Sequence, residues 1–212
     1  MPAYVYYMQR KGVIHIKNVM TYFEQHHGYA RMRELKTAGF QTRDIRALLE
    51  TGSIVKIKPG LYRLATLQAT ESSGLVEVCL AHPKAVICLT SALSLHELTT
   101  FVPTRIAYAI PRASKPVELG QWGMRAYYFS ENQYHAGIEH RNTSSGPIRI
   151  YDPEKSICDM FRFKDTLGSD LAFEVLKNYL GQRKRNLTSL MAYAAICRVK
   201  HEMSHYVKAI LG

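Results

Sequence analysis

The chain has 212 residues, 47% of them hydrophobic, and a formal net charge of +11. This apolar content is enough to bury a core, which excludes a disordered chain. No apolar run reaches 18 residues, and the N-terminus lacks a basic start followed by an apolar stretch, so we expect neither a transmembrane helix nor a signal peptide.

Residues 1–70 carry most of the net positive charge, with 11 Lys and Arg against 4 Asp and Glu. Residues 71–212 hold 17 against 13. A basic first third suggests contact with a polyanion. A basic domain without a nucleic-acid role explains the charge equally well, so the charge alone does not decide.

Three short helices are predicted in this segment. The first has apolar residues at helical spacing from Ile16 to Phe23 and ends at Gly28. The second, around Met32 to Leu35, ends near Gly39. Two short helices joined by a Gly-containing turn are typical of a helix-turn-helix when the second of the two has one apolar and one polar face.

The third helix, from about Arg43 to Thr51, meets this condition. We expect Thr42 to be its N-cap, because the hydroxyl can accept from a free backbone N–H, and Asp44 suits the positive end of the helix dipole. An arginine on the outer face can donate two hydrogen bonds to guanine in the major groove. The apolar side holds Ile45, Leu48 and Leu49, and the other side holds Arg43, Arg46, Ala47 and Glu50.

A basic hairpin is predicted directly after the third helix. Val55 and Ile57 alternate with Lys56 and Lys58, which is the period of a strand. Pro59-Gly60 suits the centre of a type II turn, with a return strand at 61–64. Such a hairpin after a recognition helix is a wing, whose lysines lie beside the phosphate backbone. The alternatives are a solvated helix face and a solubilised sheet edge.

The remaining chain is predicted to be a second, mixed α/β domain over residues 75–212, after a polar linker at Thr66 to Gly74 and a first domain at 1–70. We expect a helix at 75–81, a strand at 85–89, a helix capped by Thr90 or Ser91 up to Leu98, and strands at 105–110, 125–129 and 148–151. Asp152-Pro153-Glu154 starts a helix. The chain is then helical to its end, with Ile157 to Lys164 on one helix, 171–180 on the next and a third after Asn186.

The histidines and acids of this region suggest no catalytic centre. His201-Glu202-Met203-Ser204-His205 matches the zinc-protease pattern H-E-x-x-H, but no usual zinc ligand follows it, and an upstream ligand such as Asp170 or Glu174 would be unusual. A small acidic cluster, which could hold magnesium, consists of Asp152, Glu154 and Asp159. Asp152 and Glu154 are better explained as helix-start residues. We therefore expect no enzyme, no metal and no cofactor.

Four widely spaced cysteines without a C-x-x-C pair favour buried free thiols in a reducing cytoplasm. They are Cys79, Cys88, Cys158 and Cys197.

Several segments resemble the AbiEi family, the antitoxins of type IV toxin–antitoxin or abortive-infection systems that act in phage defence. The likeness runs from about residue 15 to 205 and rests mainly on Lys58 to Tyr62, Ser91 to His96 and Ile150 to Asp159. The tail at Lys184 to Leu187 and Tyr193 to Val199 fits it as well. Arg10 and Lys11 lie in an N-terminal extension through Val13 whose role the resemblance does not settle.

The resemblance implies a winged helix-turn-helix that binds and represses the operator of its own operon, followed by a domain that counters a nucleotidyltransferase toxin without needing to bind it. It places arginines on the recognition helix and basic residues on the wing. Candidate DNA-binding residues are Thr42, Arg43, Arg46, Lys56, Lys58 and Arg63. Two alternatives stay open: a nuclease delivered to DNA by the winged helix, and a regulator whose second domain senses a ligand.

Overall fold

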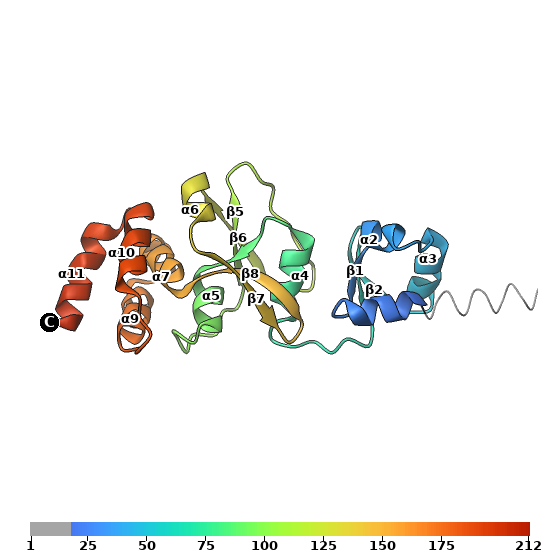
Figure 1. Cartoon of the computed structure of the whole chain (residues 1–212), viewed down its shortest axis with the longest axis horizontal. Coiled ribbons are helices and arrows are strands. Elements are labelled where there is room, and N and C mark those ends of the chain that lie inside the picture. The colour runs from blue at the N-terminus through green and yellow to red at the C-terminus, as the bar shows by residue number, and fades with distance from the viewer. Residues whose placement is uncertain (1–17) are drawn as a thin grey trace, which may run out of the picture. The chain divides into compact units, whose positions relative to one another are not determined.

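The computed structural model describes residues 18–212, which divide into two compact units (Figure 1). Unit 1 comprises the described residues up to Ser73 together with Ser144–Gly146, and unit 2 comprises Gly74–Thr143 and Pro147–Gly212. Both units combine helices with a small sheet, as the sequence predicts for an α+β protein. Ile16 and the extension through Val13 with Arg10 and Lys11 lie outside the described residues.

Unit 1 begins, in its described part, with a helix over residues 18–25. The elements that follow are β1 (Tyr29–Arg31), α2 (Met32–Thr37), α3 (Thr42–Glu50), β2 (Ile54–Lys58) and β3 (Leu61–Leu64). The strands pair antiparallel in the order β1-β3-β2. The predicted helices and hairpin are confirmed, whereas β1 escapes the sequence analysis because three residues are too few to show an alternating pattern.

The core of unit 1 lies between its helices and its sheet. Val19 and Phe23 of the first helix are fully buried, as is Leu35 of α2. Complete burial of an apolar side chain of this size stabilises the fold by about 1.5–3 kcal/mol. The other buried members of this core are Ala30, Ile45, Leu48, Ile54, Tyr62 and Leu64.

The hairpin of unit 1 contains a β-bulge that the sequence analysis does not predict. The pairing shifts by one residue between Lys56 and Lys58, so that Ile57 is the inserted residue. Ile54 and Ile57 are buried, whereas Val55 is 42% exposed. The predicted alternation, with Val55 and Ile57 on one face, is therefore wrong, because an inserted residue exchanges the faces on its two sides.

Unit 2 is built around a mixed sheet of order β6-β5-β4-β8-β7 (Figure 1). β5 (Ile106–Pro111) is parallel to β6 (Met124–Phe129) and antiparallel to β4 (Val86–Ile87), and β4 is parallel to β8 (Gly146–Tyr151). The predicted strands correspond to β4, β5, β6 and β8. The edge strand β7 (Ile138–Thr143) escapes prediction because most of its residues are polar and exposed.

Three shorter helices differ from the sequence predictions. α4 (Ser73–Ala81) begins inside the predicted linker, and α6 (Glu131–His135) was not expected. The predicted strand at 85–89 is shorter, because Leu89 already begins α5 (Leu89–Leu95).

The N-cap of α5 is Cys88, not Thr90 or Ser91 as predicted. The Ser91 hydroxyl instead accepts a hydrogen bond of 2.9 Å from the backbone N–H of Ala107 in β5. Its partner is thus supplied by a distant strand, which the local sequence does not show.

The C-terminal part of unit 2 is helical, as predicted. The helices are α7 (Pro153–Arg162), α8 (Lys164–Leu167), α9 (Ser169–Leu180), α10 (Leu187–Ile196) and α11 (Lys200–Leu211). Asp152 caps α7, accepting from the backbone N–H of Lys155 at 2.7 Å, which confirms the predicted helix start. Lys164 lies on α8 and not on α7, because α7 ends at Arg162 with Phe163 as its C-cap residue.

Two charged side chains of α7 are completely buried. The Lys155 Nζ atom lies 2.6 Å from Asp159 Oδ2, and neither side chain is exposed. The same Nζ atom lies 4.2 Å from the centre of the Tyr151 ring and 4.8 Å from that of Phe129. Burial raises the pKa of Asp159, and the ammonium of Lys155 opposes this shift. Each charge is therefore compensated inside the fold.

All four cysteines are free thiols in the structure. Cys88, Cys158 and Cys197 are buried, but Cys79 is only partly buried, so the prediction of burial is wrong for this residue. Burial raises the pKa of the Cys197 thiol to about 12, and this thiol donates a hydrogen bond to Asp159 Oδ1 at 3.4 Å.

Candidate nucleic-acid interface

The helix α3 presents its arginines to solvent because its apolar side is held in the core. Ile45 and Leu48 are 1% and 2% exposed. Arg43 and Arg46 lie on the opposite, exposed side, and the Arg43 side chain is 77% exposed. The two faces predicted from the helical wheel are thereby confirmed, and both guanidinium groups are accessible to a partner.

The start of α3 corrects one prediction. Gln41 is the N-cap residue, and Thr42 is the first residue of the helix, with an exposed side chain. The backbone N–H of Gln41 donates to Asp44 Oδ2 at 3.1 Å, so the carboxylate of the first turn stabilises the N-terminus of the helix. The hydroxyl of Thr42 is thus not the cap.

The hairpin brings a second set of basic side chains directly after α3. Lys56 on β2 is exposed, and Lys58, beside the bulge, is partly exposed. Gly60 has a φ of 79°, which the predicted turn at Pro59-Gly60 requires of its second central residue. Arg63 lies on the central strand β3, is only partly exposed, and donates to the carbonyl oxygen of Leu67 at 3.5 Å. The Arg63 side chain is therefore hydrogen-bonded to the segment that follows β3.

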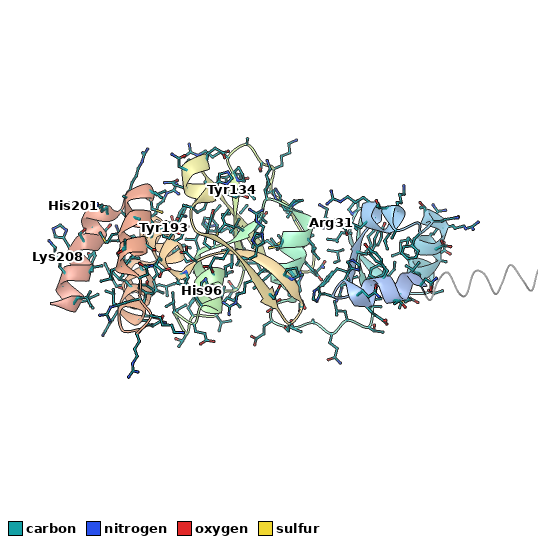
Figure 2. The ribbon with its side chains drawn as sticks, viewed as in Figure 1. Arg31, His96, Tyr134, Tyr193, His201 and Lys208 are labelled. Atoms are coloured by element: carbon teal, nitrogen blue, oxygen red, sulfur yellow. The ribbon has the colours of Figure 1, made fainter. Side chains whose placement is uncertain are left out.

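Helix α2 carries basic residues that the sequence analysis does not single out. Arg31, which is labelled in Figure 2, lies at the end of β1. It forms an ion pair of 2.9 Å with Glu34. Burial raises the pKa of Glu34, but the hydrogen bonds from Arg31 outweigh this effect and hold the pKa below its ordinary value. The Arg33 side chain is 75% exposed, and Lys36 is exposed as well. Their clustering on one short helix is visible in the sequence once the helix is placed.

Residues 18–65 match a family model described as "Transcriptional regulator, AbiEi antitoxin". We call residues 18–65, which match this family model, the AbiEi domain. The match confirms the resemblance over the helices and the hairpin of unit 1. The motifs quoted from unit 2 lie outside the matched residues. Comparison with curated proteins finds no match to the chain.

The AbiEi domain thus belongs to a family of transcriptional regulators, and its exposed α3 arginines and hairpin lysines lie within the matched segment. None of the helices in residues 18–212 combines the length and apolar character needed to cross a bilayer.

Outside the AbiEi domain, the H-E-x-x-H pattern lies on α11. His201 and His205 are exposed, and Figure 2 shows His201 on the outer side of this helix. Glu202 forms an ion pair of 2.8 Å with Lys164. The upstream candidate Glu174 accepts a hydrogen bond from Thr99. Within residues 18–212, no three His, Cys, Asp or Glu side chains are grouped to hold a metal ion.

The three acids of the predicted cluster have separate structural partners. Asp152 caps α7, Glu154 accepts from the Tyr179 hydroxyl, and Asp159 pairs with Lys155. Burial raises the pKa of Asp152 to about 6, against the opposing effect of its hydrogen bond from the Lys155 backbone. Each carboxylate of the cluster has a defined role in the fold.

Proposed function

We propose that this protein is a DNA-binding transcriptional repressor, and that its AbiEi domain is a winged helix-turn-helix with α3 as the recognition helix. The observation that carries the proposal is the exposed arginine face of α3 within the segment that matches the regulator family. The packing of Ile45 and Leu48 holds α3 rigidly, so its outer face is preformed for a groove.

The basic residues of α3 and of the wing have different roles, base recognition and contact with the phosphate backbone. Arg43 and Arg46 reach base edges in the major groove, where each guanidinium can donate two hydrogen bonds to a guanine. Lys56 and Lys58 of the wing contact phosphates, which add affinity but no sequence information. The Thr42 hydroxyl and Arg63 contact phosphates as well.

In its cellular role, the protein acts as the antitoxin of a type IV toxin–antitoxin system in the cytoplasm. It represses its own operon through the AbiEi domain and counters a nucleotidyltransferase toxin without binding it. Unit 2 carries the antitoxin activity. The AbiEi match supports regulation and antitoxin function, and the predominance of positive charge in residues 1–70 supports the contact with DNA.

The DNA-binding proposal is tested by fluorescence anisotropy on a duplex from the promoter of the protein's own operon. Arg43→Ala or Arg46→Ala should weaken binding by about 1–3 kcal/mol and relax specificity at one base position. Lys56→Ala should weaken all sequences alike and reduce the salt slope by about one unit. Lys208→Ala, an exposed lysine of α11, is the charge-matched control and should bind normally. Equal binding by the wild type and the folded Arg43→Ala, Arg46→Ala double variant would contradict the proposal.

The antitoxin proposal is tested by growth during co-expression with the toxin encoded by the neighbouring gene. The Arg43→Ala, Arg46→Ala variant, expressed from an unrelated promoter, should lose repression but still rescue growth. Failure of this folded, abundant variant to rescue would show that neutralisation works through DNA binding. Cleavage of the duplex in Mg²⁺ would instead favour a nuclease.

A further inference from the structure

A cavity of about 530 Å³ lies in unit 2 among segments that are far apart in the chain. Its wall includes Arg112 at the end of β5, Arg162 at the end of α7, and Arg198 in the turn between α10 and α11. Ser130 and Gln133, at the start of α6, add neutral polar groups. The volume falls within the range of small-molecule sites, roughly 300–1,000 Å³.

The charges around this cavity do not cancel. Lys164 and Glu202 of the wall form an ion pair of 2.8 Å, and the other charged residues are the three arginines and Asp165. The four cations of the wall therefore exceed its two acids by two charges. An excess of two positive charges matches a phosphate monoester, which carries a charge of roughly −1.5 to −2 near neutral pH.

Arg162 is held in a fixed orientation without a protein acceptor. Its guanidinium carbon lies 5.2 Å from the centre of the Phe129 ring and 4.9 Å from that of Phe163. Among residues 18–212 it donates no hydrogen bond, and its Nη1 atom is buried without a partner. Arg162 also lines the cavity, so the accessible N–H groups of its guanidinium can donate to an anion there.

The turn that carries Arg198 adds a second unusual feature. Arg198 has a φ of 63°, a left-handed conformation in which glycine is usual at the end of a helix. Val199 follows as the N-cap residue of α11, which has no side-chain cap hydrogen bond. Val199 and Glu202, a residue of the first turn, lie in the cavity wall. A helix N-terminus favours anions through its free N–H groups and its dipole.

We propose that unit 2 binds a phosphorylated small molecule of about mononucleotide size in this cavity. The phosphate lies between the guanidinium groups of Arg162 and Arg198 beside the first turn of α11, and Arg112 contacts it from the end of β5. The rest of the ligand contacts Ser130 and Gln133. This site is separate from the AbiEi domain and does not depend on DNA binding.

The test uses isothermal titration calorimetry of the full chain with AMP and inorganic pyrophosphate, and with adenosine as the ligand without phosphate. AMP and pyrophosphate should bind, and adenosine should not. Arg162→Met should weaken binding about tenfold or more, the loss expected when a charged hydrogen bond is removed. Lys208→Ala, on α11 but outside the cavity wall, should leave binding unchanged.

Arg198→Gly separates binding from folding. Glycine suits the left-handed backbone at this position, so the variant should melt at the same temperature as the wild type or higher, while it binds AMP about tenfold more weakly. Equal affinity of Arg198→Gly and wild type, or no heat with AMP and pyrophosphate at low salt, would overturn the proposal. So would binding of a single-stranded RNA that requires Arg162 when AMP and pyrophosphate do not bind, because this would assign the site to nucleic acid.

Discussion

In the AbiEi domain the arginines of α3 lie on the surface, whereas in unit 2 the ion pair Lys155–Asp159 has no exposed atom at either side chain. The exposed arginines contribute little to folding and remain free to contact a partner. The buried pair has the opposite role, because it is compensated only while the fold is intact. Mutation of Arg43 or Arg46 should therefore affect binding, whereas mutation of Lys155 or Asp159 should affect folding.

The two units also differ in how their arginines are constrained. Arg43 projects from a single helix, with Asp44 Oδ1 as its nearest acid at 3.9 Å. Arg162 is stacked against two aromatic rings, and two other chain segments bring arginines to the same cavity. An exposed arginine on one helix can reach into a groove, whereas arginines from three segments around one cavity suit a compact anion.

The largest effect on stability is expected in unit 2, from Asp159→Ala. This change leaves Lys155 buried and uncompensated, and it should lower the free energy of unfolding by about 3–5 kcal/mol, measured by urea denaturation. The double variant Lys155→Met, Asp159→Leu should recover most of this loss, because it removes both charges. Arg46→Ala in the AbiEi domain is the comparison and should stay within about 0.5 kcal/mol of the wild type. A similar loss in Asp159→Ala and Arg46→Ala would break the contrast between the units.

A smaller effect in unit 2 should depend on pH and follow from the raised pKa of Asp152, about 6 against an ordinary value near 3.9. The folded state binds this proton more tightly than the unfolded state, so the stability contribution is complete below about pH 4 and is lost as the pH rises through about 6. Relative to Asp152→Asn, which does not titrate, the wild type should therefore lose up to about 3 kcal/mol between pH 4 and pH 8. Asp152→Ala, which also removes the cap, should be about 1 kcal/mol less stable than Asp152→Asn. A pH-independent difference between wild type and Asp152→Asn would contradict this prediction.

The smallest effect concerns the start of α3 and sharpens the comparison inside the AbiEi domain. Asp44→Ala should cost about 1 kcal/mol, because it removes the acceptor for the backbone N–H of Gln41. Thr42→Ala should change the stability by less than about 0.5 kcal/mol, because its side chain is exposed and does not cap the helix. Thermal melting of the two variants measures the difference. A larger loss in Thr42→Ala than in Asp44→Ala would restore Thr42 as the capping residue.

The sequence by itself determined the features that depend on neighbours within a few residues. The apolar spacing of Ile45 and Leu48 predicted which face of α3 is buried, and Asp152-Pro153-Glu154 predicted the start of α7. Both depend on helical periodicity and capping, which act over one turn of helix.

Only the tertiary structure decided the features that bring distant segments together. The bulge at Ile57 depends on pairing with β3, and the partner of the Ser91 hydroxyl comes from β5. Asp159 follows Lys155 by one helical turn, yet only the packing of Phe129 and Tyr151 around the pair shows that it is buried. The arginine cavity joins the ends of β5 and α7 to the turn before α11. Such contacts depend on how the elements pack, and no local pattern in one sequence encodes that arrangement.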